Sequence, residues 1–155
     1  MPQMNKSGKF IFGESLIRPD GSVRLPPQAV EEYHIASEGR VYLFTGSKVT
    51  GGFCVTRQGL LLPSKLGHIL TGTPALLHYE APSGLFLPYK GRAYCWAEIS
   101  AAGEVRLTEE MLEFLRLTPG MRLLCIRSSD IAFTMGEKGP LLEKTAHFGG
   151  EMPLF

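Results

Sequence analysis

The stretch IRPDGSVRLPPQAVEEYHIASEGRVYLFTGS (residues 17–47) recurs as ISAAGEVRLTEEMLEFLRLTPGMRLLCIRSS (residues 99–129), at a constant offset of 82 and without a gap. A shift of two residues then carries the match onward at an offset of 80. The identical pairs are Ile17/Ile99, Gly21/Gly103, Val23/Val105, Arg24/Arg106, Leu25/Leu107, Glu31/Glu113, Arg40/Arg122, Ser47/Ser129, Phe53/Phe133, Gly59/Gly139, Leu61/Leu141 and Leu62/Leu142. A unit this small cannot bury enough apolar surface alone and usually buries it against its copy. The sequence therefore predicts two copies of one unit that pack together.

Both copies carry the same local signals, which predict the order β-turn-β-α-β-β, followed by a further short β segment. Gly21 and Gly103 mark tight turns. Pro26–Pro27 suits the first turn of a helix in copy one, and Thr108 is a helix N-cap in copy two. A helix of about ten residues is marginal in water, so tertiary packing must hold it. The expected strands are 10–17, 23–25, 40–44, 52–56 and 60–62 in copy one, and 93–99, 105–107, 122–126, 132–135 and 141–142 in copy two.

The predicted fold class is mainly β (α+β), as one compact unit in three parts. Residues 1–66 form the first repeat with an N-terminal extension, and residues 93–155 form the second repeat with a C-terminal tail. Residues 67–92 join them and are rich in glycine and proline. This connector also carries many apolar residues, whereas flexible linkers are polar. We therefore expect it to pack on the body, with extra strands as one form it could take.

The bulk composition describes an ordinary globular chain. Its 155 residues are 44% hydrophobic and 20% charged, with a net charge of +1. Residues 11–66 carry a net charge of +1 and residues 93–146 one of −2, so no strong field favours nucleic acid or a membrane surface. No apolar run is long enough to span a membrane, and the polar N-terminus has no signal-peptide core. The three cysteines form no CxxC motif, which favours reduced core thiols in a cytoplasmic protein.

The repeated half-motif resembles the swapped-hairpin SpoVT/AbrB-like family. Its residues are Asp20-Gly21-Ser22-Val23-Arg24-Leu25-Pro26 and Ile35-Ala36-Ser37-Glu38-Gly39-Arg40-Val41 in copy one, and Gly103-Glu104-Val105-Arg106-Leu107-Thr108 and Leu117-Thr118-Pro119-Gly120-Met121-Arg122-Leu123 in copy two. The tandem arrangement is similar to that of MraZ-type members, which carry two such units per chain. The resemblance implies a small pseudo-symmetric AbrB-like barrel in which the two copies interleave.

The resemblance also implies a DNA-binding transcriptional regulator, with double-stranded DNA as its partner. Candidate nucleic-acid-binding residues are Arg18, Arg24, Arg40, Lys48 and Arg57, which form one basic patch if the fold brings them together. For Arg24 and for Arg40 the alternative is a structural role, bridging neighbouring acids or opening an apolar strand.

The sequence departs from the family pattern at the positions that would hold DNA. The family commonly carries an arginine directly after the turn glycine, where this chain has Ser22 and Glu104. Its helix commonly carries central arginines, where copy one has Val30 and Glu31 and copy two has Leu112 and Glu113. These substitutions remove cations that would neutralise phosphates. They favour the alternative of an AbrB-fold scaffold that does not bind DNA and engages a protein or a small anionic ligand.

No motif in the chain predicts catalysis. The four histidines show no metal spacing with one another or with cysteine, and no nucleophile elbow G-x-S-x-G occurs. The sequence therefore predicts a protein that is not an enzyme and has no cofactor or metal, while an enzyme whose site is assembled in space stays as a third hypothesis that no residue supports. The first two hypotheses place the protein in the cytoplasm without a membrane partner, and the family architecture allows a homo-oligomer.

Overall fold

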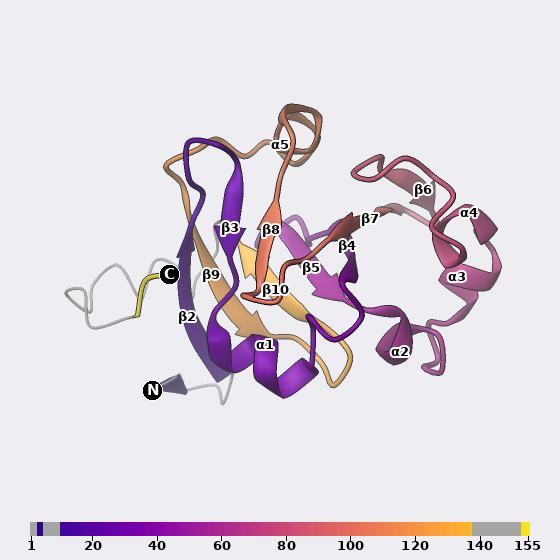
Figure 1. Ribbon diagram of the computed structural model, residues 1–155, viewed down its shortest axis with the longest axis horizontal. Helices are drawn as coiled ribbons and strands as arrows, with labels where there is room; N and C mark the ends of the chain where they lie inside the picture. Colours follow the sequence, from indigo (N-terminus) through magenta and orange to yellow (C-terminus); the bar gives the residue numbers. More distant parts are fainter. Residues whose placement is uncertain (1–2, 5–9, 138–152) are drawn as a thin grey trace.

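The computed structural model describes residues 3–4, 10–137 and 153–155, and it is mainly β (Figure 1). These residues hold ten strands and five short helices. In chain order the elements are β1 (Gln3–Met4), β2 (Phe10–Leu16), β3 (Ser22–Arg24), α1 (Pro27–Tyr33), β4 (Arg40–Thr45), β5 (Phe53–Thr56), α2 (Gln58–Leu61), α3 (His68–Thr71), α4 (Pro74–Leu77), β6 (Leu87–Tyr89), β7 (Arg92–Glu98), β8 (Glu104–Arg106), α5 (Glu109–Leu115), β9 (Arg122–Arg127) and β10 (Phe133–Gly136).

The bounds of these elements repeat along the chain. Adding 82 to β2, β3, α1 and β4 gives the bounds of β7, β8, α5 and β9, and adding 80 to β5 gives those of β10. The sequence offset that defines the repeat is therefore also the offset of its secondary structure.

The strands of the two copies interleave in one antiparallel sheet of order β1-β2-β9-β10-β5-β4-β7-β6, in which β9–β10 of copy two and β5–β4 of copy one lie between β2 and β7. The first strand of each copy pairs with the third strand of the other, β2 with β9 and β7 with β4. The second strands β3 and β8 pair with each other in a separate two-stranded ribbon. The expectation of a closed barrel is wrong, because the sheet stays open with the short strands β1 and β6 at its edges. The ribbon forms its own sheet rather than joining those edges.

Two strand pairings bring equivalent residues opposite each other. Val23 faces Val105 in the ribbon, and Cys54 faces Thr134 where β5 meets β10 in the middle of the large sheet. Residues related by a two-fold axis can pair with their own counterparts only near that axis. The two pairs therefore mark an approximate two-fold axis that runs through the ribbon and the centre of the sheet.

Backbone hydrogen bonds next to the ribbon follow the same relation. Leu25 N donates to Gly103 O over 2.9 Å, and Leu107 N donates to Gly21 O over 2.9 Å. Each copy thus holds the turn glycine of the other with an equivalent bond. Gly21 and Gly103 have φ values of 84° and 82°, which L-residues rarely adopt.

The main core lies between one face of the sheet and a layer made of the ribbon, α1 and α5 (Figure 1). Successive side chains of a strand point to opposite faces, so Val41 and Leu43 enter this core while Tyr42 and Phe44 point to the other face. Both helices have seven residues, fewer than predicted, and each ends in a left-handed residue, His34 or Arg116. The predicted N-cap is confirmed, because Thr108 Oγ1 accepts a hydrogen bond from Met111 N.

The connector, together with α2 before it, covers the second face of the sheet over β4 and β7. Leu61 of α2, Ile69 and Leu70 of α3, and Leu76 of α4 form a cluster on Tyr42 and Tyr94 of the sheet. The expected strand 60–62 is wrong, since α2 occupies 58–61 and buries Leu61 in that cluster. Helices account for more of the connector than strands, with β6 as its single strand among the described residues. The expected strand 141–142 lies outside the described residues.

Tyrosine and tryptophan side chains of the sheet form hydrogen bonds with the backbone of the connector. Tyr42 Oη donates to Leu76 O over 2.9 Å, and Trp96 Nε1 donates to Ala81 O over 2.6 Å. Buried polar groups of this kind must be satisfied, so the cover is held in a defined place and not only by apolar contact.

The cysteines agree with the expectation of core thiols. Cys54, Cys95 and Cys125 are buried and free, and burial raises the pKa of the Cys95 thiol to about 12. Among the described residues, no helix has the length and apolar character needed to cross a membrane.

The crossed glycine contacts generate the first prediction. A Cβ at Gly21 would lie 2.1 Å from Leu107 O of the other copy, whereas a Cβ at Gly39 (φ 71°) would meet nothing within 4 Å. Gly39→Ala should therefore lose only the left-handed strain of about 1–2 kcal/mol, while Gly21→Ala should lose about 1–3 kcal/mol more. Urea unfolding of both variants measures the difference. Equal losses would mean that the contact between copies is not tight.

Candidate functional site

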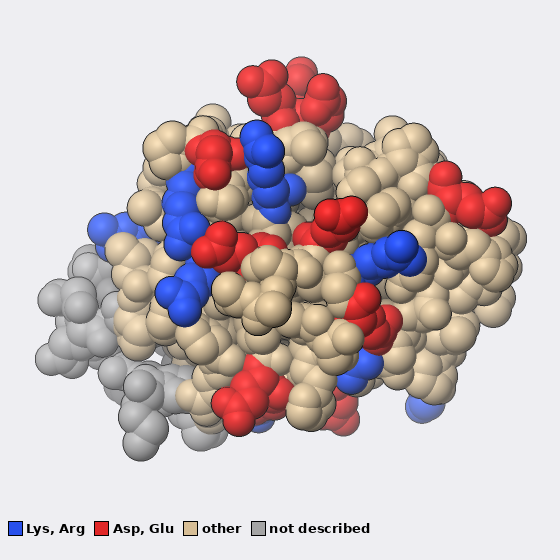
Figure 2. All heavy atoms as spheres, viewed as in Figure 1, with Lys and Arg blue, Asp and Glu red and all other residues tan. Residues whose placement is uncertain are grey.

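The five predicted nucleic-acid-binding residues do not form one cluster of free cations. Arg18 and Arg24 both meet Glu104: Arg18 forms an ion pair with it at 3.2 Å, and Arg24 faces it across the ribbon. Arg40 lies at the start of β4, beside the connector, with its guanidinium 4.5 Å from the centroid of the Tyr79 ring. Figure 2 shows acidic and basic side chains interspersed over this face of the molecule.

Arg57 has a structural environment. Its side chain is only 16% exposed, donates from Nε to Tyr33 O over 2.9 Å, and pairs through Nη1 with Glu38 Oε2 at 2.8 Å. The same Glu38 oxygen accepts from Gly59 N. Arg57 therefore joins the ends of α1, β5 and α2, and these partners leave it poorly placed to contact phosphates.

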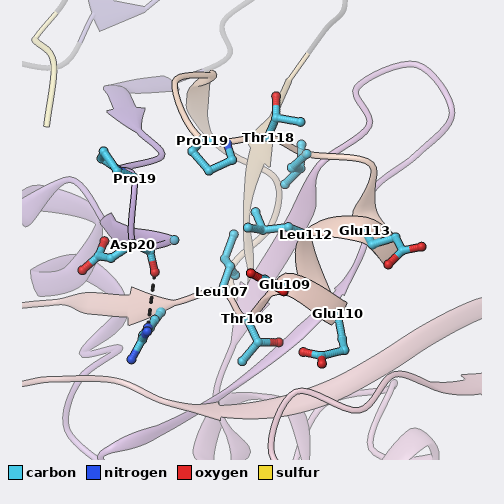
Figure 3. Close-up of a pocket in the computed structure, with 13 residues that line it drawn as sticks. Pro19, Asp20, Leu107, Thr108, Glu109, Glu110, Leu112, Glu113, Thr118 and Pro119 are labelled. Atoms are coloured by element: carbon cyan, nitrogen blue, oxygen red, sulfur yellow. Dashed lines mark hydrogen bonds between the residues drawn. The ribbon is translucent and has the colours of Figure 1, made fainter.

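A hollow of about 750 Å³ lies beside the ribbon and has acidic walls. Figure 3 shows Asp20 on one side and Glu109, Glu110 and Glu113 of α5 on the other. Arg106, the counterpart of Arg24, also lines it and donates to Asp20 O over 3.3 Å. Hydrogen bonds from Ser22 lower the pKa of the Asp20 carboxyl, so the carboxylate is favoured. A duplex approaching the ribbon would meet these charges, which repel phosphates.

A second hollow, of about 600 Å³, lies on the sheet face opposite the main core, next to the connector. Its floor includes Cys54 of β5 and Thr134 of β10, the two equivalent residues that lie opposite each other in the sheet. We call this hollow the central cleft. The residues that line it are Phe44, Ser47, Thr50, Cys54, Leu61, Leu66, His68, Ile69, Tyr89, Lys90, Arg92, Tyr94, Ser128, Ser129, Ile131, Ala132 and Thr134.

The charges of the central cleft have one sign. Its ionisable rim groups are His68, Lys90 and Arg92, and no Asp or Glu is among the lining residues. Neither Lys90 nor Arg92 forms an ion pair within 4.0 Å in the part of the chain that is described. The cleft thus presents cations whose charge is free to meet a ligand.

The β6–β7 hairpin positions Lys90 and Arg92 at the rim of the central cleft. Tyr89 pairs with Arg92 across the turn formed by Lys90 and Gly91, whose φ values of 46° and 85° are those of a type I′ turn. The backbone twist of such a turn matches the twist of the two strands that it joins. Lys90 and Arg92 are exposed residues on a well-defined support.

The positive charge of Arg92 acts to lower the pKa values of two groups in the cleft. Burial raises the pKa of the Tyr94 phenol, and the positive charge of Arg92 opposes this shift. Burial also raises the pKa of the Cys54 thiol, where a hydrogen bond from Thr134 and the Arg92 charge act in the opposite direction. Arg92 therefore favours negative charge in the space between the rim and the floor.

Hydroxyl groups supply the neutral polar part of the site. Thr134 Oγ1 contacts Cys54 Sγ at 3.4 Å and forms a hydrogen bond with Ser128 Oγ. Ser47 and Thr50 come from the loop that also carries exposed Lys48. Hydroxyls both donate and accept, so this side of the cleft can match several ligand groups. Groups of three or more His, Cys, Asp or Glu suited to a metal ion do not occur in the described ranges.

Sequence reasoning missed the central cleft because no local motif encodes it. Its residues come from β4, β5, α2, α3, the β6–β7 hairpin, β10 and the loops between them. The one signal in the sequence is Lys90-Gly91-Arg92, a cationic turn inside a connector that otherwise carries few basic residues. Of the predicted cations, only Lys48 directly follows a lining residue, Ser47, along the chain.

The surroundings of Arg57 generate a prediction that separates structure from function. Arg57→Ala should lower the free energy of unfolding by about 2 kcal/mol, because Tyr33 O and the half-buried Glu38 lose a charged donor. Lys48→Ala, at an exposed loop position, should change it by less than about 0.5 kcal/mol. Guanidinium chloride titration followed by circular dichroism compares the two. A neutral Arg57→Ala would contradict the structural role.

Comparison of the chain with models of known protein families, with curated proteins and with solved structures found no match. Inferences about function therefore depend on the geometry of the described residues and on the sequence pattern. Between the two hollows, the central cleft has the chemistry of a binding site with a definite preference for charge.

Proposed function

We propose that this protein is an AbrB-like swapped-hairpin scaffold that binds a small anionic ligand in the central cleft. The fold part of the proposal is supported by the order of the strands. First strands pair with third strands of the other copy, and second strands pair with each other, which is the interleaving that the family resemblance implies. The open sheet differs from a closed barrel by its edge strands β1 and β6.

The observation that carries the ligand part is the charge of the cleft. Lys90, Arg92 and His68 line it without any carboxylate among the lining residues. Exposed cations that gather at one hollow attract an anion more strongly than scattered surface charges do. An anion would also gain charge-assisted hydrogen bonds from Arg92 and from Lys90.

Duplex DNA remains the second candidate because of one feature of the ribbon. Arg24 and Arg106 are exposed at equivalent positions on the two sides of the approximate two-fold axis, and such a pair could meet two phosphates. The neighbouring acids weigh against it: Glu104 faces Arg24, and Asp20 and Glu109 line the hollow beside Arg106. Phosphate contacts need an excess of cations, which these residues do not provide.

Two arginine variants separate the candidates. Arg92→Gln removes a cleft cation, and Arg24→Gln removes an exposed ribbon cation and serves as the matched control. We expect pyrophosphate, titrated by calorimetry at low salt, to bind wild type and Arg24→Gln equally and Arg92→Gln about tenfold more weakly, the effect of one charge-assisted contact.

Random-sequence duplex DNA is the opposing probe in the same buffer. We expect no binding at low salt, where phosphate contacts are strongest. Duplex binding that weakens at higher salt and is lost in Arg24→Gln would support the DNA candidate instead. Absence of pyrophosphate binding to wild type would overturn the anion proposal.

A further inference from the structure

We infer that the anion bound in the central cleft carries a planar heteroaromatic ring, as a nucleoside monophosphate does. The inference rests on the proposed anion site and specifies its ligand class. It follows from the aromatic wall that stands directly beside the cleft cations, together with the hydroxyls of the floor.

Three aromatic rings from two strands and the hairpin form that wall. Phe44 and Tyr94 stack with centroids 5.4 Å apart and an interplanar angle of 30°, and Tyr89 meets Tyr94 edge-on at 6.4 Å. Phe44 and Tyr89 are only half-buried, so part of each ring remains accessible from the cleft. The accessible part of an aromatic side chain can accept another ring by stacking.

The cations lie against the same rings. The guanidinium of Arg92 is 5.7 Å from the Phe44 centroid, and the ammonium of Lys90 is 5.6 Å from the Tyr89 centroid. A ligand that places its ring on this wall therefore has its charged group close to both cations. Tyr89 Oη is hydrogen-bonded to His68 Nδ1 at 2.9 Å, which fixes the orientation of the tyrosine ring at the rim.

Size and polarity narrow the ligand class further. A lone phosphate would occupy a small part of about 600 Å³, whereas pockets of this volume suit ligands of the size of a nucleotide. The hydroxyls of Ser128 and Thr134 are hydrogen-bonded to each other, but a hydroxyl can accept a second hydrogen bond, which a purely hydrocarbon ring does not donate. A heteroaromatic ring has edge donors and acceptors for these groups.

The other repeat shows that the fold itself does not require this arrangement. At an offset of 82 the counterparts of Arg92, Tyr94 and Phe44 are Phe10, Phe12 and Ile126. A β-bulge between Ile11 and Gly13 places Phe12 in the main core, so Ile11 takes the position of Tyr94 and pairs with Ile126 in an apolar cluster. Among the described residues, the combination of two cations with stacked rings on this face belongs to the half of the sheet beside the connector.

The experiment compares three probes by calorimetry at low salt: adenosine monophosphate, ribose 5-phosphate and adenosine. Stacking of one base on an aromatic side chain contributes about 1–3 kcal/mol, so the monophosphate should bind wild type at least about tenfold more tightly than ribose 5-phosphate. Adenosine alone should bind more weakly than the monophosphate. Guanosine, cytidine and uridine monophosphates test whether the preference extends to every base.

Phe44→Leu should reduce the ratio of monophosphate to ribose phosphate affinity toward one while leaving ribose phosphate binding unchanged. Tyr89→Leu is a second variant with the same expected effect, should the first lose its native circular dichroism spectrum. The matched control is Phe10→Leu, another half-buried aromatic with a cation over its ring, Arg127 at 4.5 Å, outside the cleft.

The possible outcomes distinguish the inference about the aromatic ring from the proposal that the ligand is an anion. Equal affinities for adenosine monophosphate and ribose 5-phosphate would overturn the inference about the ring and leave the anion proposal standing. Binding of neither phosphate would overturn both. Adenosine binding as tightly as its monophosphate would contradict the anion proposal, because the cations would then contribute nothing.

Discussion

The structure depends on the exchange of strands between its two halves. Val23 and Val105 meet at the approximate two-fold axis, both almost completely buried, and each contributes about 1.5 kcal/mol or more by leaving water. On either side, the Leu25–Gly103 and Leu107–Gly21 backbone bonds lock the turns. Because β2 pairs with β9 and β7 pairs with β4, the first strand of each half needs the third strand of the other. The core between sheet and helices exists only once the halves have combined.

The internal repeat predicts where the strands run, and packing decides the rest. Alternation and turn glycines located β2 to β5 and β7 to β10 within one or two residues, since local sequence determines where an amphipathic strand runs. The prediction of a strand at Leu60–Leu62 was wrong because a short apolar stretch does not distinguish a strand from a helix. In the structure α2 places Leu61 against the sheet.

The functional site could not be predicted because its residues are far apart in the sequence. The partners of Arg57 are Tyr33 and Glu38, and the cleft joins Phe44 to Arg92 and Thr134, all distant along the chain.

The central cleft is an asymmetric site on an approximately two-fold sheet because α2 and the connector pack on one half of the sheet alone among the described residues. The two halves of the sheet begin alike, but α2, α3, α4 and β6 cover only the half formed by β4 and β7. Where that cover ends, above the paired strands β5 and β10, the central cleft opens. The rigid interleaved sheet supplies the floor, and the β6–β7 hairpin supplies the cations. The mixed charges of the ribbon, by contrast, neutralise one another, as the Arg18–Glu104 pair illustrates.

The most direct test of the interleaving is to divide the chain at the exposed turn between Lys90 and Gly91. The fragments 1–90 and 91–155 then separate β2 and β4 from their partners β9 and β7. Each fragment alone should show no cooperative thermal transition, and an equimolar mixture should recover the spectrum and transition of the intact chain as a one-to-one complex. A fragment that is monomeric and unfolds cooperatively by itself would contradict the account.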